Sequence, residues 1–322
     1  MRNAADLAAR LREGLAGVVA GNDRPAFALL VAIFAGGHVL LEGVPGTAKT
    51  LFVRSLSRLL GIRFSRIQFT PDLMPSDIVG TTVYNPKSGD FAVRLGPIFA
   101  NLVLADEVNR TPPKTQSALI EAMEETRVTI DGETHVLPSP FILCATQNPI
   151  EYEGTYPLPE AQRDRFLVRA RTEYPTADEE RALLARVAAG FDANDLARLG
   201  IEAVADVTML LEAREEVRTV RLVESVRDYI YDIVGRTRNT TTVALGASPR
   251  AGIALLRASQ ASAIIGGRDF IIPDDVKAVA PFVLPHRLVL DPDAEIDGLT
   301  PEAVVDSILS AIPVPKETSA QI

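Results

Sequence analysis

Residues 43–50 read Gly-Val-Pro-Gly-Thr-Ala-Lys-Thr, and one residue, Glu42, separates them from the largely apolar run His-Val-Leu-Leu at 38–41. This order predicts a buried strand, a tight glycine loop and then a helix that begins near Thr50. Such a loop points successive backbone N–H groups at one place, where the positive end of the helix dipole also acts. Phosphate is the ligand that such a cradle fits, so the stretch predicts a phosphate-binding loop.

The residues expected to bind the phosphates are those of the loop and of the first helical turn: Gly43, Val44, Pro45, Gly46, Thr47, Ala48, Lys49, Thr50 and Leu51. Lys49 is placed to reach the β- and γ-phosphates of a nucleotide, and the Thr50 hydroxyl to bind Mg²⁺. The pattern G-x-x-x-x-G-K-[ST] has glycine where Ala48 stands, so we expect ordinary backbone angles there. A glycine turn with a solvent-facing lysine is the alternative interpretation.

Two acidic residues, Asp106 and Glu107, follow the apolar run Leu-Val-Leu-Ala at 102–105. The run predicts a second buried parallel strand, and the carboxyl ends of such strands face the crevice where open α/β sheets bind ligands. We expect Asp106 to orient Mg²⁺ through its water shell and Glu107 to polarise an attacking water. Two surface acids at the end of a strand are the alternative.

A third apolar run, 141–145, ends in Thr-Gln-Asn-Pro at 146–149. The uncharged amide of Asn148 could hold the attacking water by a hydrogen bond, while a plain Asn-Pro turn is the simpler interpretation. Both interpretations can hold together. Cys144 within the run is expected to be a small buried apolar residue, because no histidine partner is indicated nearby.

In this order the motifs resemble those of the AAA+ ATPases and, within them, the MoxR family. The resemblance runs from about residue 36 to 281, and it is carried by residues 43–50, 105–110, 146–149, 157–166 and 246–251. It implies a three-layer αβα P-loop nucleotidase core with a parallel sheet, followed by a smaller all-helical lid domain. It also implies ATP and Mg²⁺ as the cofactors.

The resemblance gives roles to four catalytic residues besides Asp106: Glu107 completes the Walker B pair, Asn148 is the first sensor, Arg165 the arginine finger and Arg250 the second sensor. An arginine matches spread phosphate charge because it is planar and always protonated. From the residues alone, a solvated salt-bridge partner remains the simpler interpretation of either arginine. Whether Arg163 or Arg165 reaches the phosphate stays open, as does whether Arg250 serves its own subunit or a neighbour.

Composition is consistent with a cytoplasmic ATPase that is not embedded in a membrane. The chain has 322 residues, 47% of them apolar, enough for one full α/β core and a smaller domain. A single cysteine excludes an internal disulfide and suits a reducing compartment. The apolar stretch 26–35 is too short to span a bilayer and predicts a buried helix.

The chain is expected to divide into two parts. Residues 1–175 alternate strand and helix patterns and form the ATP-binding core, whereas residues 176–322 form the helical lid with a linker helix. Within the lid, Ser248-Pro249 and Pro273 predict helix starts. The polar, threonine-rich stretch 236–246 predicts a loop.

Two hairpins are expected to project from the core, at about 73–98 and 127–137, the second turning at Asp131-Gly132. Hairpins of this kind commonly contact the molecule on which the ATPase acts. The alternative is that they are insertions without a binding role. The net charge of −9 and the acidic tip at Asp131 and Glu133 disfavour a nucleic-acid target. A protein target is therefore favoured.

These observations together predict an ATPase that hydrolyses ATP to ADP and phosphate in order to remodel or mature a protein partner. The family resemblance implies a homo-oligomeric ring, a hexamer, with a chaperone-like role. It also implies von Willebrand factor A-type partner proteins and metal-cofactor insertion. The alternatives are a nucleic-acid motor and a nucleotide-gated binding module without useful turnover; the intact Lys49, Asp106 and Glu107 argue against the latter.

Overall fold

A computed structural model describes residues 2–16, 18, 23–87, 89–148, 154–192 and 201–315 of the chain. Five parallel strands form its central sheet, in the order β2-β5-β8-β1-β9. They are β1 (Val39–Gly43), β2 (Phe64–Gln68), β5 (Leu102–Asp106), β8 (Ile142–Gln147) and β9 (Val168–Thr172). The three apolar runs identified in the sequence are the central strands β1, β5 and β8. Their carboxyl ends meet at one edge of the sheet.

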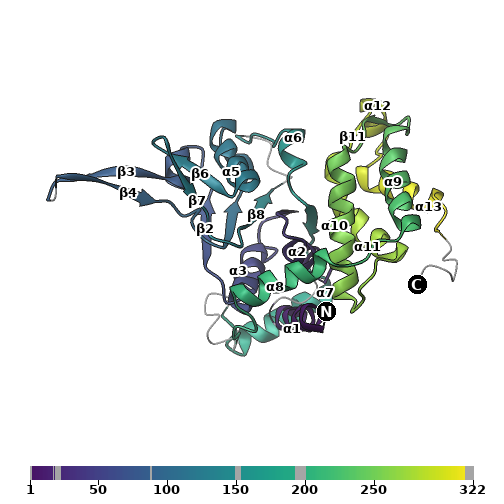
Figure 1. Cartoon of the computed structure of the whole chain (residues 1–322), viewed down its shortest axis with the longest axis horizontal. Helices are drawn as coiled ribbons and strands as arrows, with labels where there is room; N and C mark the ends of the chain where they lie inside the picture. Colours follow the sequence, from purple (N-terminus) through teal and green to yellow (C-terminus); the bar gives the residue numbers. More distant parts are fainter. Residues whose placement is uncertain are drawn as a thin grey trace.

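Helices cover both faces of the sheet, as the α/β class requires (Figure 1). Those of the first half are α1 (Arg2–Ala16), α2 (Asp23–Ala35), α3 (Lys49–Leu59), α4 (Pro75–Val79), α5 (Pro113–Glu125), α6 (Glu160–Arg163) and the 3-10 helix η1 (Val108–Arg110). Alternate strand residues point to opposite faces. Leu104 joins a buried cluster with Leu29 of α2 and Leu56 of α3, whereas Val103 joins a second cluster with Leu119 of α5. The prediction of a three-layer core is confirmed.

The chain beyond β9 is mostly helical. It contains α7 (Ala177–Ala188), α8 (Val207–Arg218), α9 (Glu224–Arg238), α10 (Pro249–Ile265), α11 (Pro273–Val283), η2 (Pro285–Arg287), α12 (Pro292–Ile296) and α13 (Pro301–Ala311). Helices α10 and α11 begin at the prolines from which their starts were predicted. The loop predicted over 236–246 is wrong in part, because α9 continues to Arg238 and Val243–Leu245 form strand β10, which pairs with β11 (Val289–Leu290).

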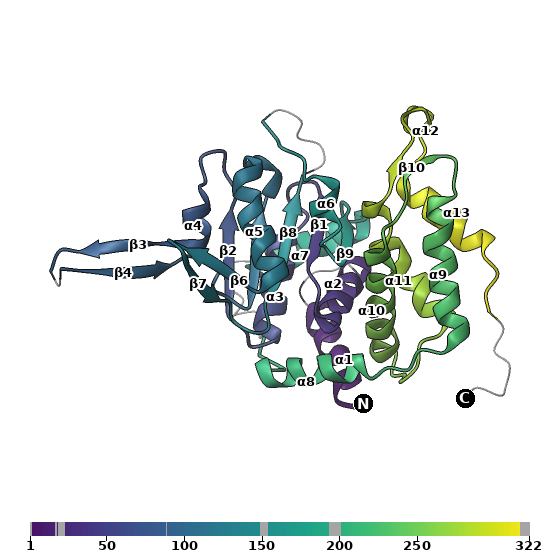
Figure 2. The same cartoon turned by 45° about the horizontal axis from the view of Figure 1, so that its top comes forward.

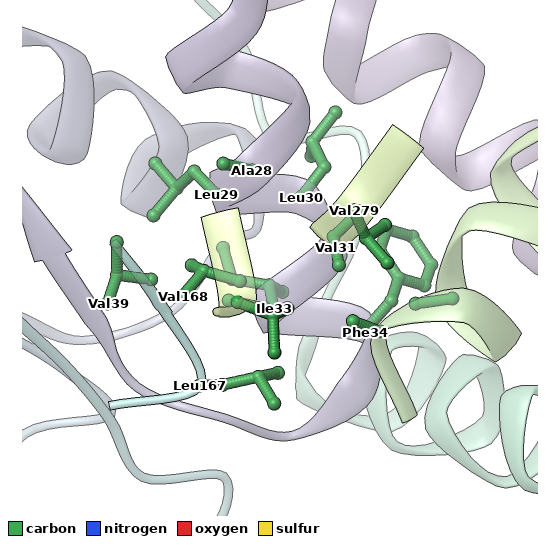
Figure 3. Close-up of a cluster of buried hydrophobic side chains, with 14 of the residues drawn as sticks. Ala28, Leu29, Leu30, Val31, Ile33, Phe34, Val39, Leu167, Val168 and Val279 are labelled. Carbon is green, nitrogen blue, oxygen red and sulfur yellow. The ribbon is translucent and has the colours of Figure 1, made fainter. Parts of the chain in front are cut away.

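The helical part packs directly on the core. Val279 of α11 belongs to the same buried cluster as Val31 and Phe34 of α2 (Figure 3). Helix α10 also packs along α2, and α8 packs against both α1 and α2 (Figure 2). Continuous apolar burial of this kind couples the position of the helical part to that of the sheet.

Both predicted hairpins are present. Strands β3 (Gly80–Asn85) and β4 (Asp90–Leu95) form a ribbon that projects well beyond the rest of the chain (Figures 1 and 2). Strands β6 (Arg127–Ile130) and β7 (Glu133–Val136) form the second, shorter hairpin. The backbone N–H of Thr82 donates to the Asp131 carboxylate at 2.9 Å, so the tip of the short hairpin is attached to the long one.

The long ribbon carries an apolar face that the rest of the described chain does not cover. Tyr84 and Phe91 lie opposite each other in the ladder, with ring centroids 5.3 Å apart, and Phe91 is 74% exposed. Thr82 and Val93 continue the same face, since residues two apart in a strand point the same way. An exposed apolar surface of this kind commonly marks a site of protein interaction.

Cys144, the single cysteine, lies fully buried in the middle strand β8. Its burial raises the pKa of the thiol to about 12, because a thiolate would lose its hydration there. The residue is the small buried apolar group that the sequence predicts. Among the described residues, no helix combines the length and apolar character that crossing a membrane requires.

Candidate active site

The phosphate-binding loop predicted from the sequence lies between β1 and α3. Gly43 at its start packs so closely on β9 that a Cβ there would stand 2.1 Å from Thr172 Oγ1 and 2.4 Å from the Thr172 carbonyl oxygen. Only glycine fits this contact. Gly46 has a φ of +85°, a conformation that glycine adopts without strain.

Ala48 departs from the expectation of ordinary backbone angles. Its φ of 58° and ψ of 21° place it in the left-handed region, immediately before the first residue of α3. The chain must turn there to direct its N–H groups at one place and enter the helix. For a residue with a Cβ this conformation costs roughly 1–2 kcal/mol. The prediction of an unstrained loop at Ala48 was therefore wrong.

A cavity of about 430 Å³ opens at the carboxyl edge of the sheet beside this loop. Its walls combine the loop with the ends of β2, β5 and β8: Pro45, Gly46, Thr47, Ala48, Lys49, Thr50, Leu51, Arg54, Arg66, Asp106, Glu107, Thr146, Gln147 and Asn148. Most residues proposed from the sequence to bind nucleotide or metal thus meet in one place. Gly43 and Val44 line a neighbouring cavity instead.

Lys49 lies at the mouth of the loop with its ammonium group anchored to the backbone. Its Nζ donates to the carbonyl oxygens of Gly43 at 2.5 Å and of Val44 at 2.9 Å. Partial burial lowers the pKa of Lys49, while the charges of Asp106 and Glu107 act in the opposite direction. Lys49 lines the same cavity as the two carboxylates.

Asp106, at the end of β5, is held between two neighbouring strands. Thr146 Oγ1 of β8 donates to Asp106 Oδ1 at 2.6 Å, and the Arg66 guanidinium of β2 binds Oδ2 through Nη2 at 2.7 Å. The hydroxyl of Thr50 and the Asp106 carboxylate supply oxygen ligands of the kind Mg²⁺ prefers. The donor set therefore fits the ion, although Arg66 competes for one carboxylate oxygen.

Glu107 follows β5 in a left-handed conformation, with a φ of 60°. Gln68 Nε2 donates to Glu107 Oε2 at 2.9 Å, and Arg110 Nε lies 3.1 Å from the same oxygen. The Glu107 N–H donates to Thr146 Oγ1 at 2.8 Å. The carboxylate is thus fixed at the cavity wall, where Asn148 follows β8 and is buried.

Sequence reasoning did not assign a role to Arg66, Gln68 or Thr146. Arg66 and Gln68 come from β2, which pairs with β5 so that Gln68 lies opposite Asp106. The order of the strands across the sheet cannot be deduced from the spacing of residues along the chain. Thr146 was quoted as part of a motif, and only the pairing of β5 with β8 reveals that it links Asp106 to Glu107.

Arg165 and Arg250 do not line the cavity; they meet on another carboxylate, that of Glu124 in the last turn of α5. Arg165 Nη2 donates to Glu124 Oε2 at 2.9 Å, and Arg250 Nη2 donates to Oε1 at 3.1 Å. These contacts, that of Arg165 first, lower the pKa of Glu124. Arg163 instead lies 3.5 Å from Glu160 on its own helix. The structure thus brings together the two arginines that the sequence resemblance paired with phosphate.

A smaller cavity of about 90 Å³ also adjoins the loop, and Asp106 and Glu107 do not line it. Most of its exposed lining is apolar and comes from residues such as Val18, Leu51, Leu183 of α7 and Phe191, while Glu173, Glu179 and Arg186 lie at its walls as well. The sequence at 20–23, Ala-Gly-Asn-Asp, departs from the Gly-Gln-Glu usual in the family near the adenine pocket, and residues 20–22 fall outside the described residues. The loop therefore separates a polar cavity from an apolar one.

Two family profiles match the chain. The one described as "ATPase family associated with various cellular activities (AAA)" covers residues 38–168, and the one described as "AAA lid domain" covers residues 235–308. The first spans β1 to the start of β9, including the whole polar cavity. The second spans the end of α9 to α13, including Arg250.

Several characterised and uncharacterised proteins resemble the chain over most of its length. Chaperone MoxR1 of Mycobacterium tuberculosis is 44% identical over 93% of this chain and 80% of its own. Protein MoxR of Paracoccus denitrificans is 31% identical over 97% of this chain and 98% of its own. An uncharacterized protein of Bacillus subtilis, YeaC, is 50% identical over 94% and 93%.

Structural similarity agrees with these sequence matches. The crystal structure of a putative ATPase from Cytophaga hutchinsonii superposes with a TM-score of 0.88 and 40% identity, covering 97% of this chain and 96% of that one. The match extends over both the sheet core and the helical part. The chain belongs to the MoxR family of AAA+ ATPases.

Proposed function

We propose that this protein hydrolyses ATP to ADP and phosphate, with Mg²⁺, and uses the cycle to remodel or mature a protein partner. The observation that carries the proposal is the polar cavity in which Lys49, Thr50, Asp106, Glu107 and Asn148 converge beside a phosphate-binding loop. A binding module without turnover would not need a carboxylate fixed beside the phosphate cradle.

In this proposal Glu107 polarises the attacking water, and the Asn148 amide helps to orient it. Lys49 leaves its carbonyl partners to pair with the β- and γ-phosphates, offsetting the negative charge that accumulates there. Bound Mg²⁺ would neutralise part of the phosphate charge, held by Thr50 and, through its water shell, by Asp106. To take this role, the Asp106 carboxylate would have to give up its ion pair with Arg66.

The adenine base is proposed to lie in the apolar cavity beside the loop. A base has two apolar faces, and the side chains of Leu51 and Leu183 offer surfaces of that kind on one side of the phosphate loop. Helix α7 would then close over the nucleotide. None of its residues is buried in the structure, so it has apolar surface left to cover a ligand.

The site is proposed to be completed by a neighbouring subunit in a homo-oligomeric ring, a hexamer. Arg165 and Arg250 lie outside the chain's own phosphate cavity, which supports their action on the nucleotide of a neighbour. Arginines supplied across an interface accelerate phosphoryl transfer by about 10³–10⁵ in other NTPases.

The client is proposed to be a protein. The exposed apolar face of the β3–β4 ribbon suits a polypeptide, whereas the net charge of −9 opposes a phosphate backbone. The name of the Mycobacterium tuberculosis relative, a chaperone, supports the same role. Partners with von Willebrand factor A-type domains, metal-cofactor insertion and a cytoplasmic location belong to the proposal through the family.

Three measurements test this function. ATP turnover by the purified protein should require Mg²⁺ and should be lost in the Lys49→Ala variant, which no longer binds nucleotide. Proteins retained by a Glu107→Gln variant in the presence of ATP, and released without it, would identify the client. Strong stimulation of turnover by DNA at about 150 mM salt would contradict the proposal and favour a nucleic-acid motor.

A further inference from the structure

Glu124 is the one carboxylate within the described chain that both Arg165 and Arg250 are seen to contact. Arg165 binds it through two nitrogens, with Nε 2.8 Å from Oε1 and Nη2 2.9 Å from Oε2. Arg250, from the first turn of α10, donates through Nη2 to Oε1 at 3.1 Å. Two guanidinium groups from distant parts of the sequence therefore share one anion.

The backbones that carry these arginines are held by other contacts. Asp164, which precedes Arg165, accepts from Ser248 Oγ at 3.1 Å and from Arg287 Nε at 2.8 Å. Arg287 is buried and also donates through Nη2 to the Phe166 carbonyl oxygen at 2.6 Å. Ser248 stands two residues before Arg250, so this network joins the two arginine-bearing segments without Glu124.

Glu124 is also poorly placed to stabilise its own helix. It lies in the last turn of α5, where the helix dipole presents its negative end and disfavours carboxylates. The arginines offset this repulsion. A carboxylate needed neither for the helix nor for the backbone of its partners is best explained by what it does to their side chains.

A carboxylate and a phosphate make the same kind of contact with arginine, since the planar guanidinium pairs with two oxygens of either group. The terminal phosphate of ATP carries more negative charge than a carboxylate. It can therefore replace Glu124 between the two arginines when it is brought close to them.

We propose that Glu124 is a positioning residue that keeps Arg165 and Arg250 together on one anion until a phosphate of a neighbouring subunit's nucleotide displaces it. The inference rests on the proposed function, because it requires a nucleotide to approach the two arginines across an interface. Its consequence is that Glu124 competes with ATP, so removing its charge should strengthen the response to nucleotide.

The test compares Glu124→Gln with wild-type protein and with Glu125→Gln as a matched control. Glu125 is the next residue on α5 and pairs with Arg127 at 2.7 Å, away from both arginines. Half-exposed ion pairs contribute up to about 1 kcal/mol each, so Glu124→Gln should lower the KM for ATP by about threefold to tenfold. The change in kcat should be smaller, Glu125→Gln should match the wild type, and Glu124→Asp, which keeps the charge, should stay close to it.

A second measurement does not depend on turnover. ATP-driven association of subunits in a Glu107→Gln background, followed by molecular mass, should reach its midpoint at a lower ATP concentration when Glu124→Gln is added. That shift should disappear in the Arg165→Ala, Arg250→Ala double variant, because Glu124 acts only through these side chains.

An unchanged KM and an unchanged association midpoint would overturn the inference. So would a fall in kcat that Glu124→Asp restores, because Glu124 would then be needed to orient the arginines during the reaction. Absence of turnover in the wild type, or turnover insensitive to Lys49→Ala, would instead overturn the proposed function. In that case the association measurement still decides whether Glu124 competes with nucleotide.

Discussion

The polar cavity can be compared with the arginine cluster, by which we mean Arg165, Arg250 and Glu124, because the charges of the two regions are arranged in opposite ways. In the cavity, two carboxylates, Asp106 and Glu107, are held by the cations Arg66 and Arg110. In the cluster, two cations, Arg165 and Arg250, are held by the carboxylate of Glu124. Each half thus contains internal partners that nucleotide or metal would have to replace. In a single chain, therefore, all four of these proposed site residues have a partner of opposite charge within the same chain.

The largest effect on ATP turnover is expected from a substitution in the arginine cluster. Arg165→Ala should lower ATP turnover by about 10³-fold or more, because the charge that stabilises the transition state is lost. Arg163→Ala is the matched control and should have a much smaller effect, because the ion pair of Arg163 seen in the described residues is with Glu160 of its own helix. Steady-state turnover at several protein concentrations provides the measurement.

Mixing the variants tests whether the two halves come from different chains. Subunits with Arg165→Ala and subunits with Glu107→Gln are each inactive in this view, yet some interfaces of a mixed ring pair an intact Arg165 with an intact Glu107. Mixing should therefore restore part of the turnover. Full activity in a stable monomer would instead support the interpretation of Arg165 as a solvated salt-bridge partner.

In the polar cavity, the corresponding substitution is Glu107→Gln. The substitution keeps the shape of the side chain and removes the charge that polarises water, so hydrolysis should fall at least about 10²-fold while ATP binding persists. Binding is measured with a fluorescent ATP analogue and turnover by phosphate release. Hydrolysis at the wild-type rate would show that Glu107 is not the activating group.

Inside the core, His38 connects β8 with α5. Its Nδ1 accepts from the Leu143 N–H at 3.0 Å and its Nε2 donates to the Met123 carbonyl oxygen at 3.1 Å, next to Glu124. Burial lowers the pKa of His38 from 6.5 to about 4, so the folded chain keeps the ring neutral.

This burial predicts a loss of stability in acid. Between pH 6.5 and about 4 the unfolded chain protonates His38 and the folded chain does not, so stability falls as pH drops through that window, by about 3 kcal/mol. His38→Gln should show a shallower fall in the free energy of unfolding over the same window. Other groups titrate there, including buried His286, and so the difference between the two proteins is the relevant quantity. Parallel curves would contradict the assignment.

Substitutions in the hairpins should change neither the polar cavity nor the arginine cluster directly. Asp131→Ala removes the contact with the Thr82 N–H and should loosen the attachment between the two hairpins, whereas Glu133→Ala changes charge alone. We expect Asp131→Ala to alter the effect of a client protein on turnover severalfold and to leave basal hydrolysis almost unchanged. Turnover of either variant should remain insensitive to DNA, and a large loss of basal hydrolysis would link the hairpins to the chemistry.

The smallest effect is expected at Ala48. Glycine adopts the left-handed conformation freely but also gains freedom in the unfolded chain, so Ala48→Gly should stabilise the protein by less than about 1 kcal/mol. Thermal unfolding with and without ATP measures this. A clear loss of stability would mean that the Ala48 methyl group makes a contact worth more than the strain.

Much of this arrangement could be predicted from the sequence, because apolar runs that end in polar residues identify parallel strands and the edge where they meet. Asp106 and Asn148 were found in this way and Lys49 from the glycine-loop pattern, and all three line one cavity. Side-chain contacts between neighbouring strands and between distant helices could not be predicted from the sequence. Arg66 meets Asp106 through lateral strand order, and Glu124 meets Arg250 only because α10 packs beside the core.

The burial of Cys144 has a practical consequence for experiments on this protein. A thiol with a pKa of about 12 inside the central sheet is almost entirely protonated at neutral pH and shielded from reagents, and the chain has no other cysteine. Maleimide probes should leave the folded wild-type protein unlabelled. A single cysteine introduced by Lys87→Cys on the projecting ribbon would then carry a dye or spin label alone. Distances within an assembly could be recorded on an otherwise native background.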